Sequence, residues 1–245
     1  MNADRTSVIR GFIVNGASQG LPWGTQVSLL DLSVEIEYVV GGALIWNTPL
    51  KGLRAGATFY TSDSEMNGTL LVSIPLLPQQ PLLQYTVQSP TSLSYKVNYA
   101  YVLSAEYTVG NLILAAEYFY QRGDIHPRAA PGVPELPPLE QNMQGFYGQF
   151  RYRFFDRFEV GSYYSVHHPN ADDKDGDFYV ARGEPDYLAW QRDLAVSLRF
   201  DIFPNWLVKL EGHYIDGAAL VDIPENPDDL ERHWGLFGLK TTFSF

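Results

Sequence analysis

The chain has 245 residues, no cysteine and a formal net charge of -11 at pH 7. The lack of cysteine excludes disulfides, thiolate metal sites and a cysteine nucleophile. The acidic balance argues against a nucleic-acid partner, because phosphate binding needs clustered Lys and Arg.

Aromatic residues make up 14% of the chain, with 16 Tyr and 14 Phe, a composition that favours strands. A single all-β domain spanning 1–245 is expected, because closed β structures of this size are common.

The sequence of the N-terminal region predicts β-strands and does not predict a membrane-spanning helix. No apolar stretch reaches the ~18 residues of a spanning helix, and the best candidate, YVVGGALIW (38–46), contains two glycines. TSVIRGFIV (6–14) predicts a first strand, and further strands follow from about residue 34. No export signal is visible at the start, so two interpretations stay open: a signal replaced by a starting Met, or a piece of a longer protein.

Residues 68–90 form an apolar segment, GTLLVSIPLLPQQPLLQYTVQSP, within an expected outer loop. Exposed Leu, Ile and Val would be costly there unless covered. Three alternatives follow: a constriction folded into the barrel, a latch onto a neighbouring subunit, or a short extra hairpin. The prolines Pro75, Pro78 and Pro81 disfavour a regular central strand, so the first two are preferred.

From residue 95 onwards the sequence alternates apolar and polar residues in segments of about 9 to 11 residues, the length of a tilted membrane strand. In 192–202, Leu194 and Leu198 fall on one face while Arg199 and Asp201 fall on the other. These polar faces are too charged for a soluble core. The apolar faces are therefore predicted to contact lipid, and the polar faces to line an interior.

The charged interior positions are predicted to set the field felt by a permeating solute. They comprise Arg54, Lys96, Glu106, Glu117, Arg151, Arg153, Glu159, Arg199, Lys209, Glu211, His213 and Lys240. Arg151 or Arg153 is expected to pair with Glu159. Lys209, Glu211 and His213 are expected to bond to neighbouring strands, especially to Arg199 and Lys240. Because the two signs are nearly balanced, selectivity should be modest.

The connections alternate between short and long. Short turns are predicted at 48–52, 109–111, 155–157 and 203–205, and long loops at about 62–92, 123–143, 168–189 and 217–232. This is typical of a transmembrane antiparallel up-and-down β-barrel, with short periplasmic turns and long extracellular loops. About ten strands are expected. A barrel this narrow has little free lumen, so a plugged barrel and the C-terminal portion of a larger porin both remain open.

Two groups of residues suggest chemistry without completing a site. Asp173, Asp175 and Asp177 resemble the start of a calcium loop, but the twelfth position would be Arg182 instead of Glu. They remain a weak calcium candidate, and no cofactor is predicted. His213 and the His167–His168 pair lack a serine partner at a consistent height on the lipid side, so no enzyme is expected.

The C-terminus carries a family resemblance. Phe237, Leu239, Phe243 and Phe245 alternate up to the final residue, which resembles the ending of Gram-negative outer-membrane barrels that the barrel-assembly machinery recognises. Residues 193–245 resemble the last three strands of phosphate-selective and related porins.

This resemblance implies an outer-membrane location and passive diffusion of small hydrophilic solutes. It also implies partners: the lipid bilayer, lipopolysaccharide and the barrel-assembly machinery, with a second copy of the chain as a further candidate. Acidic outer loops could also bridge divalent ions to lipopolysaccharide phosphates. The alternatives are a narrow structural or adhesive barrel that acts through its loops and, less favoured, an outer-membrane enzyme.

Deleting Phe245 should impair assembly in cells far more than it weakens a folded barrel, because one terminal residue adds little burial but completes the alternating signal. Outer-membrane levels in cells would be compared with refolding yield of the purified variant in detergent. Normal levels of the deletion variant in cells would contradict the assembly role.

Overall fold

The computed structural model describes residues 26–75, 84–128, 138–181, 183–221 and 230–244. Within them, nine strands form one antiparallel sheet in sequential order, β1 to β9. The strands are β1 Gln26–Asn47, β2 Leu53–Pro75, β3 Gln84–Val109, β4 Leu112–Arg128, β5 Leu139–Phe154, β6 Phe158–His168, β7 Gln191–Phe203, β8 Trp206–Gly217 and β9 His233–Phe243. Helical structure in the same residues is limited to α2 Asp177–Val180 and η1 Asp186–Ala189.

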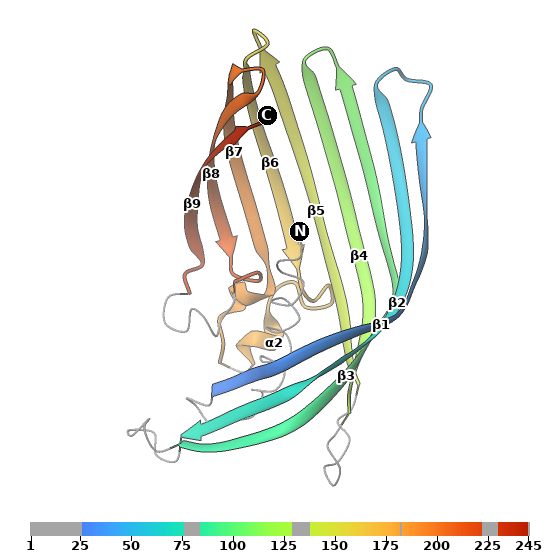
Figure 1. Ribbon diagram of the computed structural model, residues 1–245, viewed down its shortest axis with the longest axis vertical. Helices are drawn as coiled ribbons and strands as arrows, with labels where there is room; N and C mark the ends of the chain where they lie inside the picture. Colours follow the sequence, from blue (N-terminus) through green and yellow to red (C-terminus); the bar gives the residue numbers. More distant parts are fainter. Residues whose placement is uncertain (1–25, 76–83, 129–137, 182, 222–229, 245) are drawn as a thin grey trace.

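The sheet is an up-and-down meander that curves strongly, as Figure 1 shows. The four short turns lie together at one end, beside the C-terminal end of β9, while the long connections and α2 lie towards the other end. This confirms the expected all-β barrel-type fold. The predicted strand at 6–14 and the terminal Phe245 lie outside the described residues. No helix in the described part of the chain is long and apolar enough to cross a membrane.

The first short turn depends on Gly52. Its φ is +88°, and an added Cβ would lie 2.0 Å from the carbonyl oxygen of Thr108. The Thr108 amide also donates to the Gly52 carbonyl at 2.9 Å. Because L-residues rarely adopt this conformation, glycine allows β2 to start directly beside β3.

Two of the predicted long loops are mostly strand. β2 continues to Pro75 and β3 begins at Gln84, so most of 62–92 is a paired hairpin. Of the three alternatives for 68–90, the hairpin is the one observed, and Pro90 is tolerated opposite Thr69. β4 and β5 likewise extend into 123–143. The prediction missed these extensions because it expected strands of membrane length only.

The outer face of the sheet carries the apolar residues. Leu198 on β7, Leu210 on β8 and Leu239 on β9 are register neighbours, and Leu198 and Leu239 are 57% and 73% exposed. Continuous exposed apolar rows are costly in water and match the lipid-facing band of a membrane barrel. The alternation predicted for β5, β7, β8 and β9 is therefore confirmed.

A β-bulge at Asn98 reverses the two faces of β3. At this point β3 contains one residue more than β2 and β4. Beyond the bulge, Val97 is only 3% exposed, and Lys96 lies on the outer face opposite Asp63 and Asp124. The prediction that Lys96 lines the interior is wrong, because strict alternation cannot register an inserted residue.

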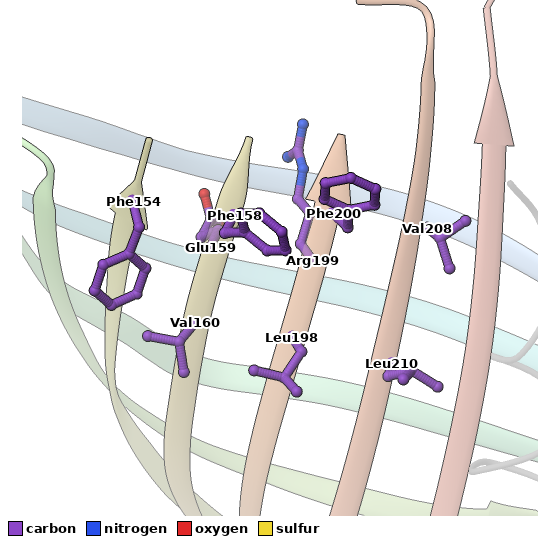
Figure 2. Close-up of a pocket in the computed structure, with 9 residues that line it drawn as sticks. All are labelled: Phe154, Phe158, Glu159, Val160, Leu198, Arg199, Phe200, Val208 and Leu210. Carbon is purple, nitrogen blue, oxygen red and sulfur yellow. The ribbon is translucent and has the colours of Figure 1, made fainter. Parts of the chain in front are cut away.

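Aromatic residues gather on the outer face near the short turns. Phe158 of β6 and Phe200 of β7 stack with ring centroids 4.6 Å apart, and Phe203 stacks on Trp206. Figure 2 shows Phe158, Phe200 and neighbouring aliphatic side chains lining a shallow groove across β5 to β8. Such a girdle is expected at the periplasmic interface of an outer-membrane barrel.

Arginine at Leu198 should destabilise the folded protein by about 2 kcal/mol or more, because a charge on the lipid face must enter the hydrocarbon. Arginine at the adjacent Ser197 is the matched control. It faces inward opposite Glu211, so it should be tolerated. Unfolding free energies in lipid vesicles would be compared, and equal losses would contradict the face assignment.

Candidate functional site: the charged inner wall

A row of charged residues crosses the inner face near the short turns. The register aligns Arg153 of β5, Glu159 of β6, Arg199 of β7, Lys209 of β8 and Lys240 of β9. These five predicted lumen residues therefore lie at one level on neighbouring strands. We call this set the basic row, because four of its five members are cationic.

Asp201 holds two arginines of the basic row. Its carboxylate accepts from Nη2 of Arg153 and, at 2.7 Å, from Nε of Arg199. The sequence predicted that either Arg151 or Arg153 pairs with Glu159. Nη1 of Arg151 lies 4.0 Å from a carboxylate oxygen of Glu159, as the first alternative predicted. Arg153, the other alternative, also donates to the backbone carbonyl of Asp156. The hub is therefore Asp201, which the sequence placed on the inner wall without assigning it these partners.

Lys209 on β8 pairs with Glu211 on its own strand. Nζ of Lys209 is 3.0 Å from a carboxylate oxygen of Glu211. Across the strands, Lys209 faces Arg199 on one side and Lys240 on the other. Among the described residues, neither Lys209 nor Glu211 forms an ion pair with Arg199 or Lys240, so these two expected partners are wrong. The expected bond to a neighbouring strand is made instead by His213, which contacts Asp193 of β7. Lys209 carries the same charge as Arg199 and Lys240. Like charges directly opposite each other destabilise a sheet.

His213 belongs to a hydrogen-bonded network on three strands. Its Nδ1 lies 3.0 Å from Oδ2 of Asp193 and 3.3 Å from the Tyr163 hydroxyl. Tyr163 donates to Asp193 at 2.7 Å, and Nε2 of His213 is 3.8 Å from Glu211. The sequence indicated a histidine in a lumen network but missed Tyr163, because an inward tyrosine looks no different from an interfacial one.

The inner face of β2 to β4 carries fewer charges. Arg54 and Glu106 are opposite in register and 3.8 Å apart, and Glu117 lies on the same inner face of β4, opposite Tyr147 of β5. Farther from the short turns, Tyr60 donates to Gln121 at 2.9 Å. Polar side chains thus continue around the wall from β8 to β2.

The wall is basic near the short turns. On β5 to β9 the inner positions there carry Arg151, Arg153, Arg199, Lys209 and Lys240 against Glu159, Asp201 and Glu211. This level of the inner wall therefore presents more cationic than anionic side chains. The arrangement offers charge and hydrogen bonds to hydrated solutes, which is the chemistry of a selectivity zone.

The other candidates are placed apart from this wall. Asp173 accepts a hydrogen bond from the backbone amide of Phe178 at the start of α2, and Asp177 is the first residue of that helix. Asp175 lies in the same loop. The residues that the structure describes contain no group of three His, Cys, Asp or Glu suited to a metal ion. His168 contacts the carbonyl of Ala189 at 3.2 Å.

Comparisons with known proteins give distant similarity. No protein-family model matches the chain, and no curated protein matches it in sequence. A NanC porin structure in a rhombohedral crystal form is 13% identical, covering 86% of this chain and 100% of that one, with a TM-score of 0.39. In-vitro folded OmpT, an outer membrane protein of Vibrio cholerae, is 10% identical over 89% of this chain and 63% of that one, with a TM-score of 0.42.

Changing Asp201 to Asn should lower the free energy of unfolding by about 1–3 kcal/mol, because it leaves two arginines without their shared carboxylate. Unfolding would be followed by denaturant titration in detergent micelles. Asp156→Asn, in the exposed turn 155–157, is the matched control and should change stability by less than ~0.5 kcal/mol. Equal effects would show that Asp201 does not hold the wall together.

Proposed function

We propose that the chain forms a porin-type channel in the outer membrane of a Gram-negative bacterium and admits small hydrophilic solutes or ions by passive diffusion. The observation that carries this proposal is a charged inner wall behind an apolar outer wall. Arg199 faces inward while its neighbours Leu198 and Phe200 face outward.

A soluble barrel would have the opposite distribution, with its apolar side chains inside and its charges in water. In a membrane the outer rows contact lipid, and the inner rows can be polar because the interior holds water or paired charges. The lipid bilayer and the barrel-assembly machinery are the partners this placement requires.

Whether the chain conducts depends on how its edges close. Among the described residues, β1 and β9 each pair on one side only. Closure could involve a further strand near the N-terminus or a second copy of the chain. In either case the basic row would lie on the wall of the pore and favour anions modestly, since Glu159, Asp201 and Glu211 offset part of its charge.

A second candidate is a structural or adhesive barrel that acts through its outer loops. The loop between β6 and β7 supports it, because η1 and the residue that follows are folded against the end of the sheet: Leu188, Ala189 and Trp190 are buried. Ala218, after β8, donates to the carbonyl of Tyr187 at 2.9 Å. Absence of conductance from well-folded protein would favour this alternative. We propose no enzymatic reaction.

Reversing the charge of Lys240 tests the channel and its selectivity zone. Lys240→Glu should move ion selectivity towards cations, because a wall charge acts at short range on each passing ion. The new carboxylate would also face Lys209, so folding should be preserved. Reversal potentials across a salt gradient in planar bilayers would measure the change.

The matched control is Lys51→Glu in the exposed turn between β1 and β2, which alters total charge by the same amount. It should shift the reversal potential much less. Equal shifts would show that overall charge, and not the wall, controls permeation. No conductance from either folded variant or from the wild type would overturn the channel proposal for this chain on its own.

A further inference from the structure

Charged residues also occur on the outer wall, at the extracellular ends of β7, β8 and β9. Arg192, Asp216 and His233 are register neighbours there, and Arg232 directly precedes β9. Arg192 and Asp216 share the face that carries Leu194. Charges on a lipid-facing wall are costly within the hydrocarbon and are expected only at its boundary.

The position of Arg192 along β7 matches the upper boundary of the membrane. The outward positions from Phe200 back to Leu194 are all apolar, and Arg192 is the next outward residue. From Phe200 to Arg192 the strand covers ~27 Å at ~3.4 Å per residue, or ~20 Å of thickness at a tilt of ~40°. An apolar band of roughly this height therefore ends at Arg192.

The two arginines are held in place by one carboxylate and one ring. Asp216 accepts from Nη1 of Arg192 at 3.1 Å and from Nε of Arg232 at 2.9 Å. Both guanidinium groups lie over Trp190, at 5.2 Å and 5.3 Å from its ring centroid. Trp190 is buried, whereas the side chains of Arg192 and Arg232 are 42% and 45% exposed. Among the described residues, the remaining N–H groups of the two arginines have no hydrogen-bond partner, so they are available to a ligand from outside.

Arg192 and Arg232 share the carboxylate of Asp216, which leaves one positive charge among these three residues. The hydrogen bond to Asp216 raises the pKa of Arg232, and Asp186 adds to the effect. Asp186 offsets the remaining positive charge, so the cluster exerts little attraction at a distance. A ligand is therefore held by direct hydrogen bonds to the arginines. His233, 3.5 Å from Asp216, borders the cluster on β9.

We propose that Arg192 and Arg232 bind a phosphate group of lipopolysaccharide, the phosphorylated glycolipid of the outer leaflet. The planar forks of two arginines match phosphate oxygens. Leu194 and Tyr214, directly below, would contact the acyl chains of the same lipid; both are exposed on the outer wall. This inference rests on the outer-membrane placement proposed above, but not on conduction.

Binding of lipopolysaccharide to the purified full chain in detergent tests the site, with tryptophan fluorescence as the readout because both guanidinium groups lie over the Trp190 ring. The wild type should bind lipopolysaccharide about 30-fold more tightly than the Arg192→Gln, Arg232→Gln variant, since each basic residue at an anionic membrane surface contributes about fivefold. Enzymatically dephosphorylated lipopolysaccharide should bind both proteins at the weaker level. Equal binding of the two lipids by the wild type would overturn the proposal.

Arg157→Gln, in a turn at the other end of the sheet, removes a comparable exposed charge and should bind like the wild type. Loss of heat-modifiable gel mobility in the double Gln variant would mean that it does not fold. The Arg192→Lys, Arg232→Lys variant then replaces it, because it keeps two positive charges beside Asp216. It should still bind at least threefold more weakly, because lysine lacks the planar fork. Unchanged affinity in the folded Lys variant would overturn the role of the arginines.

Inorganic phosphate alone should not displace the lipid at equal concentration, and full displacement would mean a free-anion site instead. Conductance measured on the same samples separates the two proposals. Failure of lipid binding with conductance intact would refute only the lipid site, while loss of conductance with binding intact would refute only the channel.

Discussion

The structure depends on one constraint: every backbone N–H and C=O inside a membrane must find its partner within the protein. A meander of antiparallel strands meets this demand for β2 to β8, because each of them bonds to the strand before and the strand after it. The outer edges of β1 and β9 meet it only when the sheet closes. The side chains of each strand are then divided between two faces with a period of two. Lipid requires one face to be apolar, so all polar chemistry of the spanning region is confined to the other.

This confinement explains the character of the inner wall. Arg199, Lys209 and Lys240 face one another on adjacent strands, an arrangement that opposes pairing of the sheet. Asp201 and Glu211 offset part of that repulsion, because each pairs with the cation two residues before it on its own strand, Arg199 and Lys209 respectively. The excess of cations therefore lowers the stability of the sheet, and packing does not require it. This favours a role for these cations in binding or passing solutes.

The sequence predicted those features that follow from local alternation. The outward position of Leu198 and the inward position of Arg199 required only a period of two, and the short turns were found from their spacing. It did not predict the place of Lys96, because one inserted residue at Asn98 reverses the faces of β3. It also missed the long hairpin of β2 and β3, since strands that continue beyond the bilayer have no need to alternate as membrane strands do.

The partners of the inner wall could not be read from the sequence for a related reason. Alternation shows which residues face inward, but the register between strands decides which of them meet. Register placed Lys209 between two cations and left it to pair with Glu211 on its own strand, and it brought Tyr163 and His213 to the same carboxylate. The outer cluster shows the same dependence, because Arg192 and His233 meet Asp216 through register alone. Functional groups in this fold are therefore assembled across strands. The insertion or deletion of one residue in any turn or bulge would shift the register and rearrange several of these groups at once.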